Sequence, residues 1–477
     1  MNVNDYVLKY FDENNEELSK LAKEIWDYAE LGLEEHKSCK AIIDVLEREG
    51  FSIEENISDM PTAFIGTWGS GEPIIGILGE YDALAGLSQK VSHIKEPVIE
   101  GAGGHGCGHN LLGIGSLGAV VAAKRAMEKY GIKGTVRYYG CPAEETISSK
   151  VFMARDGIFD DLAASLTWHP DFANAAYYSS TLAMNSFKVN FHGITAHAAG
   201  DPQEGRSALD ASIIMDIGVN YLREHVIQEA RIHSIITHGG DAPNIVPGYS
   251  QIHYIIRAPK RQDVEEIYER VKNIAKGAAL ITGTTYDIEF ICGTYNYTVN
   301  NTINDLIADK LAQVGPIEYT EEELEFAKNL IGSLEPGQFE SFLSSHRLDI
   351  DEIGGIICGR IADELELKGF SKGEVVPVSG DRADVSYITP SAQFGTTCVP
   401  LGTAEHNWQF VASCGSTIGF KGMILAAKVM ALATLDFMQK PELLKAAQDE
   451  LDSVRKGKEY VSPIPSDITI KKIMEKH

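Results

Sequence analysis

The sequence predicts an α/β fold, a three-layer α/β domain with a mostly parallel sheet, interrupted by an inserted ferredoxin-like α+β domain. Three observations predict it. The strand-like runs of the first part of the chain are continuously apolar rather than alternating, which is typical of strands buried between helices. Helices and such strands follow one another along that part. After residue 183 the order becomes β-α-β-β-α-β, which is typical of a ferredoxin-like unit.

The first part of the larger domain is expected to span residues 1–182. Two helices are expected in its first fifty residues, where apolar side chains recur at helical spacing. A long segment, 111–129, is apolar nearly all round and is expected to be a buried helix. The expected strands around it are AFIGTW (63–68), PIIGILG (73–79), TVRYYGC (135–141) and AASLTW (163–168).

The inserted domain is expected at residues 183–297, and the second part of the larger domain at 298–477. In that second part, the acidic stretch TEEELEFAKNLIGSLEPGQFESF (320–342) is expected to be irregular. The run CVPLG (398–402) is expected to be a strand, and GMILAAKVMALATLDFM an apolar helix.

Composition limits the function classes. The 477 residues, 44% of them hydrophobic and 23% charged, fit a globular protein of two or three domains. A formal charge of -26 argues against nucleic acid or an anionic membrane as a partner. Seven scattered cysteines indicate a reducing compartment, and neither a signal peptide nor a membrane span is expected. A cytoplasmic protein is therefore predicted.

Polar side chains that could carry chemistry follow the buried strands, where open α/β sheets place their sites. One group lies in the glycine-rich stretch GHGCGHN, and others lie in CPAEET, TWHP and GTAEHNW. A further carboxylate, Asp82, lies just after the strand IIGILG. The candidates in these four stretches are Cys107, His109, Glu144, Glu145, His169 and His406.

Each candidate alone has an ordinary structural explanation, such as a buried thiol, a helix N-terminus or a turn. Together they form the ligand set of zinc and similar divalent ions. Two adjacent glutamates fit this chemistry, because one can bind metal while the other takes a proton from water. The rival interpretation is a nucleophilic Cys107 with a histidine base. The pair Glu144–Glu145 argues against it, since a cysteine nucleophile needs no such pair.

Several motifs together resemble the dinuclear-metal amidohydrolases, a family that includes aminoacylases, glutamate-cleaving carboxypeptidases and hydrolases of auxin conjugates and hippurate. The likeness is to its cysteine-bearing branch, and it is strongest to hydrolases of the p-aminobenzoyl-glutamate B-subunit type and to the related dipeptidases. It covers nearly the whole chain and is weakest in about 316–375. The motifs are GEYDALAGLSQ, GHGCGHNLLG, CPAEE, LTWHP, GRSALDA, NIVPG and EHNWQ.

The resemblance implies two divalent metal ions per subunit, zinc or manganese, with cobalt or nickel also compatible. Thiolate favours zinc. The resemblance also implies that Glu144 is the general base, which activates the water and later protonates the leaving amine. The implied metal ligands are Cys107, His109, Glu145, His169 and His406.

The resemblance also assigns roles to the inserted domain, as a lid through which two copies form a homodimer. His197 would reach the partner's active site and stabilise the oxyanion. Asn244 and Arg257 would bind the carboxylate of the substrate, the arginine through a bidentate pair. A heteromer with a related subunit is a second possibility.

The implied function is hydrolysis of the amide bond of N-acyl or aminoacyl amino acids, such as p-aminobenzoyl-glutamate-like substrates, by metal-activated water. The alternatives are a dipeptidase acting on β-alanyl or basic dipeptides, and a noncatalytic assembly subunit. The chain departs from the family twice. Glu80-Tyr81-Asp82 replaces a His-x-Asp motif, which leaves Asp82 to orient a ligand. Ala404-Glu405 changes the loop before His406, which puts side-chain selectivity in doubt.

Overall fold

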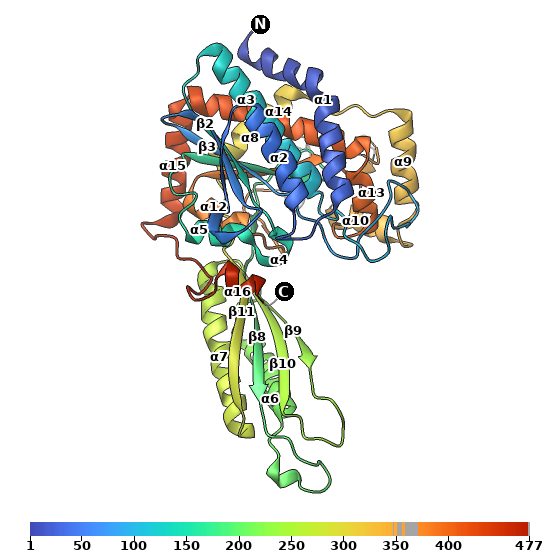
Figure 1. Ribbon diagram of the computed structural model, residues 1–477, viewed down its shortest axis with the longest axis vertical. Helices are drawn as coiled ribbons and strands as arrows, with labels where there is room; N and C mark the ends of the chain where they lie inside the picture. Colours follow the sequence, from blue (N-terminus) through green and yellow to red (C-terminus); the bar gives the residue numbers. More distant parts are fainter. Residues whose placement is uncertain (347, 351–354, 358–370, 476–477) are drawn as a thin grey trace.

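The computed structural model describes residues 1–346, 348–350, 355–357 and 371–475. A larger domain carries the N-terminus, and a narrow domain, called the lid from here on (residues 183–294), projects from it (Figure 1). The last lid strand ends at Thr294 and an extended segment follows it. The domain limit at residue 297 therefore stays a prediction.

The larger domain is built on a seven-stranded sheet between layers of helices, which confirms the predicted α/β class. The strand order is β1-β2-β4-β3-β5-β13-β6; β4, β3, β5 and β13 run parallel, and the outer pairs run antiparallel. The carboxyl ends of the four parallel strands therefore meet at one edge of the sheet. The strands are β1 Ser52–Glu55, β2 Phe64–Ser70, β3 Ile74–Gly79, β4 Gly134–Gly140, β5 Ala164–Asp171, β13 Ser391–Thr397 and β6 Ala175–Ala176.

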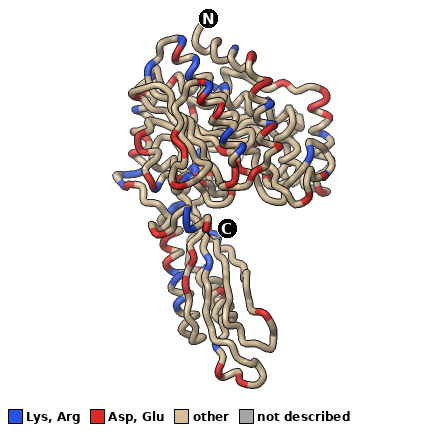
Figure 2. Tube along the Cα trace, in the orientation of Figure 1, with Lys and Arg blue, Asp and Glu red and all other residues tan. Residues whose placement is uncertain are grey.

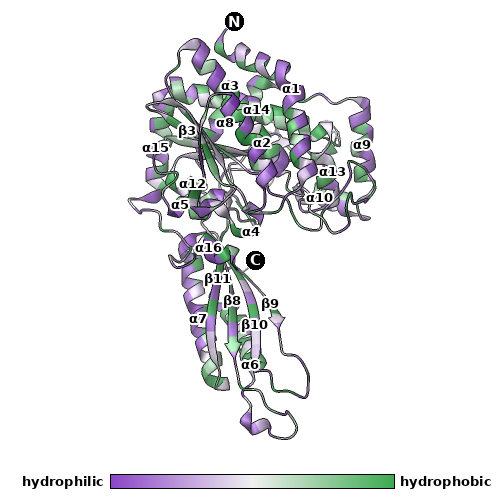
Figure 3. Cartoon of the chain, viewed as in Figure 1, coloured by the Kyte–Doolittle hydropathy of each residue, from purple (hydrophilic) through white to green (hydrophobic). Residues whose placement is uncertain are grey.

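Both faces of this sheet are buried. Ile77 lies in the core that α1, α3 and α14 share, and its neighbour Leu78 lies in the core that contains α5. Because successive strand residues point to opposite faces, burial on both faces produces the continuous apolar runs seen in the sequence. Figure 3 shows that α14 is predominantly hydrophobic along its length, as a core helix should be.

The helices of the larger domain come from both sides of the lid in the sequence. α14 is long and apolar enough to cross a membrane, but 83% of that stretch is buried inside the protein, as in a core helix. The helices are α1 Val3–Tyr28, α2 His36–Arg48, α3 His109–Tyr130, α4 Glu144–Ile147, α5 Ser149–Arg155, α8 Asn301–Val314, α9 Glu321–Ile331, α10 Gln338–His346, α12 Arg382–Ile388, α13 Trp408–Cys414, α14 Thr417–Gln439, α15 Pro441–Arg455 and α16 Ile470–Met474. A two-stranded parallel sheet joins β7 Ser180–Thr181 to β12 Val375–Val376.

The lid is a four-stranded antiparallel sheet in the order β11-β8-β10-β9, with α6 and α7 packed on it. The predicted order β-α-β-β-α-β is confirmed. Its elements are β8 Ala183–His192, α6 Ala208–Leu222, β9 Arg231–His238, β10 Tyr249–Ala258, α7 Arg261–Thr282 and β11 Thr285–Thr294.

Two predictions about the second part of the larger domain were wrong. CVPLG is a turn, and the strand is the preceding segment β13, whose Gln393 and Thr396 are polar but buried. The acidic stretch 320–342 is not irregular, because it contains α9 and the start of α10. The hydroxyl of Thr320 accepts the N–H of Glu323 and the carboxylate of Glu323 accepts the N–H of Thr320, a reciprocal cap that starts α9.

Candidate active site

A cavity of about 970 Å³ opens at the carboxyl ends of the four parallel strands. Its lining combines residues that follow β3, β4, β5 and β13 with residues from the near end of the lid sheet. All of the predicted metal ligands, together with Glu144 and Arg257, line this cavity. A site at this position agrees with the general location of binding sites in open α/β sheets.

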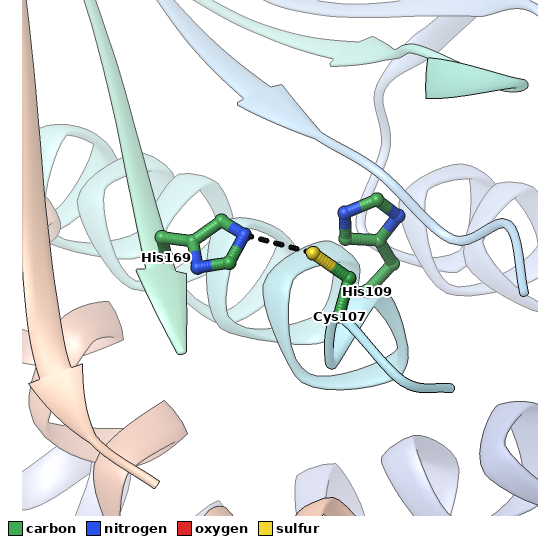
Figure 4. A group of neighbouring side chains, drawn as sticks. All are labelled: Cys107, His109 and His169. Atoms are coloured by element: carbon green, nitrogen blue, oxygen red, sulfur yellow. Dashed lines mark hydrogen bonds between the residues drawn. The ribbon is translucent and has the colours of Figure 1, made fainter. Parts of the chain in front are cut away.

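Cys107, His109 and His169 lie side by side (Figure 4) in the lining of the cavity, at the part called its floor from here on. Cys107 and His109 come from the start of α3 and His169 from the end of β5, and Cys107 Sγ lies 3.3 Å from His169 Nε2. Between them Gly108 has a φ of 74°, and a Cβ there would lie 2.8 Å from Pro170 Cγ. Glycine is therefore needed for the turn that places the thiol and the imidazole side by side.

The two imidazoles are held through their Nδ1 atoms. His109 Nδ1 donates to Asp82 Oδ1 at 2.8 Å, and His169 Nδ1 donates to the carbonyl of Pro170 at 2.8 Å. Such contacts fix the ring orientation and leave Nε2 for a metal ion. The contact expected of Asp82 is thus present, and the second oxygen of Asp82 accepts the backbone N–H of Glu145 at 3.0 Å.

Glu145 and His406 complete the cluster, with ligand atoms close to that of Cys107. His406 Nε2 lies 3.5 Å from Glu145 Oε1, an oxygen that is buried without a hydrogen bond. His406 has a left-handed φ of 58°, the kind of strained backbone that persists where the surroundings impose it. Glu405, one of the two residues that depart from the family's pattern in this loop, precedes His406, and its Oε1 lies 3.6 Å from His169 Nδ1.

The donor atoms fit divalent metal ions. They form three overlapping groups, and within each group the ligand atoms lie within 4.8 Å of one another. Thiolate, imidazole and carboxylate together are typical of zinc and related ions. The three groups are Cys107, His109 and His169; Cys107, Glu145 and His406; and His109, Glu144 and Glu145.

The surroundings of Cys107 disfavour the rival interpretation of a cysteine nucleophile. Burial raises the pKa of its thiol well above the ordinary value, and the nearby carboxylates of Glu405 and Glu145 add to the effect. A nucleophilic cysteine needs the opposite, an environment that favours the thiolate. A metal ion supplies such an environment, since coordination deprotonates the thiol.

Glu144 lies against a buried charge cluster that the sequence reasoning missed. Lys150, fully buried, has its Nζ 2.6 Å from Glu80 Oε1 and 2.8 Å from Asp381 Oδ1. The other oxygen of Glu80 lies 3.1 Å from His109 Nε2. Burial raises the pKa of Glu144 well above its ordinary value, and the carboxylates of Asp381 and Glu80 raise it further.

The three lid residues predicted for the site lie at opposite ends of the lid. Arg257 is paired with Met184 near the larger domain and lines the cavity. His197 and Asn244 lie in the loops at the far end, where both are exposed. There the N–H of Ala198 donates to the carbonyl of Asn244 at 3.0 Å. Since the ten residues of β8 rise about 3.3 Å each, that end lies roughly 30 Å from the cavity of its own chain.

The comparisons with known proteins agree with this architecture. A family model described as a peptidase dimerisation domain matches residues 183–282. The chain is 41% identical to the B subunit of p-aminobenzoyl-glutamate hydrolase of Escherichia coli (strain K12), over 94% of this chain and 95% of that protein. It is 28% identical to the Xaa-Arg dipeptidase of Mus musculus, over 92% and 90% of the two chains.

Among solved structures, the Bacillus subtilis YXEP protein, described as a dinuclear metal binding peptidase from the M20 family, has a similar fold. Its TM-score is 0.58 at 15% identity, with 90% of this chain and 99% of that chain covered. Together with the relatives above, this likeness extends over both domains. The chain therefore belongs to the M20 family of amidohydrolases and peptidases, in the group that contains the B subunit of p-aminobenzoyl-glutamate hydrolase, and it is a hydrolase of amide bonds.

Proposed function

We propose that the chain cleaves the amide bond between an acyl or aminoacyl group and an amino acid with a free carboxylate, with p-aminobenzoyl-glutamate as the first substrate to test. The convergence of the thiol, imidazole and carboxylate donors beside Glu144, on one cavity, carries the proposal. A hydrolase named for that substrate is 41% identical over nearly the whole chain, which supports it.

Two divalent ions are assigned to this cluster, with Cys107, His109, Glu145, His169 and His406 as ligands. Zinc or manganese are the first candidates, and cobalt or nickel also suit the donors. Bound there, such ions would polarise the substrate carbonyl and lower the pKa of a water molecule.

Glu144 is the residue that moves the proton in this proposal. Its carboxylate lies beside the ligand atoms of His109 and Glu145, so it can take a proton from water and return it to the leaving nitrogen. The raised pKa favours uptake of a proton by this carboxylate, which both tasks require. Lys150 separates Asp381 and Glu80 from each other and keeps these two carboxylates in place behind Glu144.

His197 and Asn244 are proposed to act in the site of a partner subunit. The Nδ1 atom of His197 accepts the N–H groups of Ala199 and Gly200, at 3.2 and 2.8 Å. The proton of the neutral ring is then on Nε2, which can donate to an oxyanion. Arg257, which lines the cavity of its own chain, is proposed to bind the substrate carboxylate.

A homodimer through the lid would bring these residues together. The lid presents apolar side chains to solvent on α6 and on the edge strand β9, among them Tyr221, 76% exposed, and Ile235, 63% exposed. Figure 2 shows that charged residues are numerous on α7, which packs on the lid sheet, and few on β9. An edge strand with few charges beside apolar side chains is suited to pairing with a second copy.

The other interpretations differ in what the purified chain does. A heteromer is suggested by the name of the bacterial relative, which describes one component of a larger enzyme, and a noncatalytic assembly component would not hydrolyse substrate alone. The complete set of donors with Glu144 favours a catalytic chain. A dipeptidase is suggested by the Xaa-Arg dipeptidase relative. The buried free thiols of the described cysteines support a cytoplasmic location.

The test uses the purified full-length chain with and without metal. We expect about two divalent ions per subunit, and hydrolysis of p-aminobenzoyl-glutamate that a chelator abolishes and added metal restores. Cys107 should resist alkylation in the metal-loaded protein and react after chelation, since coordination occupies its sulfur. Absence of hydrolysis across a panel of N-acyl amino acids and dipeptides by metal-loaded chain would contradict the proposed activity.

A further inference from the structure

The cavity contains a second arginine besides Arg257. Arg382 is the first residue of α12 and lines the same cavity. The Nε atoms of Arg257 and Arg382 are both buried without a hydrogen bond, and among the described residues neither side chain forms an ion pair. Both side chains are half-buried, and a desolvated Nε without an acceptor is unfavourable, so two such cationic groups lining one cavity suit an anionic ligand.

Two acidic residues of this region, Asp381 and Glu80, are occupied by Lys150. Asp381 Oδ1 accepts from Lys150 Nζ, and Asp381 Oδ2 accepts from the backbone N–H of Lys150 at 2.9 Å. Glu80 also contacts Lys150. The guanidinium of Arg382 lies instead over the ring of Tyr297, 5.5 Å from its centre, which holds it without neutralising it.

Gly380 shows that this guanidinium lies next to the reacting end of the cavity. A Cβ built on Gly380 would lie 3.3 Å from Arg382 Nη1 and 3.7 Å from Glu144 Oε1. Both atoms therefore border one small space, which the missing side chain of the glycine leaves open. An anionic group there would be close to the carboxylate that protonates the leaving amine.

Arg257 lines the same cavity from the near end of the lid sheet. In the lid sheet Arg257 pairs with Met184, and Met184 pairs with Thr294. The next residue, Tyr295, donates its N–H to Asp384 on α12 at 3.0 Å. This contact ties the near end of the lid sheet to the helix that begins with Arg382. Two cationic groups thus face the cavity from the junction of the two domains.

From this arrangement we infer that Arg382 is a specificity-determining residue that binds a second carboxylate, on the side chain of the leaving amino acid. The inference rests on the proposed function, in which Arg257 binds the first carboxylate. Substrates then release a dicarboxylic amino acid, glutamate or aspartate. The uncharged glutamine analogue leaves Arg382 unpaired, and a basic side chain is repelled by it. A bidentate charged contact corresponds to roughly a 10- to 100-fold preference in kcat/KM.

The experiment compares p-aminobenzoyl-glutamate with p-aminobenzoyl-glutamine, which differ in one charge. The metal-loaded full chain should prefer the glutamate compound roughly 10- to 100-fold in kcat/KM, mainly through KM. Arg382→Gln should bring the ratio close to one, and Arg382→Lys should retain part of it. Arg48→Gln, at an exposed arginine of α2, is the matched control and should leave the ratio unchanged.

Two results would overturn the inference. One is wild-type activity of Arg382→Gln on both substrates, and the other is an equal loss with both, which would mean a structural role; either result leaves the glutamate-to-glutamine ratio unchanged. Calorimetric binding of free L-glutamate and L-glutamine gives a readout that needs no turnover. Chain that binds glutamate selectively through Arg382 but hydrolyses neither compound would contradict the proposed function and retain the inference. Hydrolysis of both compounds at equal rates would support the proposed function and contradict the inference.

Discussion

The floor of the cavity and the far end of the lid carry the two halves of the proposed chemistry in opposite environments. On the floor, His109 is buried, contacts Asp82 and Glu80, and has its pKa raised well above the ordinary value because these carboxylates outweigh the effect of burial. At the end of the lid, His197 is exposed, and its ring contacts only backbone N–H groups of its own loop among the described residues. The contacts of His109 come from its own chain, whereas the role proposed for His197 requires a partner subunit.

This difference separates what one chain can do from what needs two. Metal binding depends on residues that the chain itself brings together, so it should not require the lid loops. In the proposed function, oxyanion stabilisation depends on a loop roughly 30 Å from the cavity of its own chain. Substitutions on the floor should therefore affect metal or proton transfer within one subunit, and substitutions at the end of the lid should affect catalysis across subunits.

The largest effect is expected at Glu144. Glu144→Ala should lower kcat on the order of 10²–10⁴-fold with metal content unchanged, because this residue moves a proton and is not assigned as a ligand. Elemental analysis of the purified variant measures its metal content, and steady-state kinetics measure kcat. Glu145→Ala is the matched comparison and should lose metal as well as activity. Loss of metal from Glu144→Ala would show that the two neighbouring glutamates have been assigned the wrong way round.

The next largest effect is expected at Lys150. Lys150→Met should lower the free energy of unfolding by about 3–5 kcal/mol, because it leaves Glu80 and Asp381 buried without a cation. Chemical denaturation measures the change. Lys445→Met removes an exposed helix pair with Asp449 and should change stability by less than about 1 kcal/mol. Similar losses in the two variants would contradict the role given to the buried cluster.

A smaller, pH-dependent effect is expected at Asp384, which joins α12 to the lid through Tyr295. Burial raises the pKa of Asp384 to about 7, although contacts with the N–H of Tyr295 and the hydroxyl of Tyr460 oppose the shift. Because the pKa of Asp384 is higher in the folded protein, its protonated carboxyl stabilises the fold at pH values below the ordinary carboxyl pKa near 4. This contribution is lost as the pH rises to about 7. Asp384→Asn should remove that loss.

Melting curves of wild type and Asp384→Asn at pH 5 and pH 7.5 test this expectation. The variant should gain stability relative to wild type as the pH rises, because asparagine stays neutral and can keep both contacts. Asp449→Asn, at an exposed position, is the control. A difference between wild type and Asp384→Asn that does not change with pH would contradict the raised pKa.

The parts of the fold that could be predicted from sequence were those with a local signal. Strands buried on both faces read as apolar runs, and the glycines around Cys107 indicated the turn into α3. The strand β13 gave no such signal, because it contains buried polar residues; Thr396, for example, donates to the distant carbonyl of Gly422. The missed α9 did have a local signal in the cap formed by Thr320 and Glu323.

The candidate site was predictable where residues follow strands in sequence. The cluster of Lys150, Glu80 and Asp381 was not, because Lys150 and Asp381 are 231 positions apart and nothing local marks either as buried. Arg382 was missed for the same reason, since an arginine in a polar stretch is usually exposed. Pairing across the fold, rather than residue type, decides the role of such side chains.

The claim that each site is shared between two subunits is tested most directly by mixing two inactive variants, His197→Ala and Glu144→Ala. Co-expressed with different affinity tags, they should give a heterodimer that recovers up to roughly half of the wild-type activity, since one of its two sites then has both residues intact. Each variant purified alone should stay inactive, and metal content should be that of wild type throughout. A verified, metal-loaded heterodimer without activity would contradict the claim and place His197 outside the partner's site.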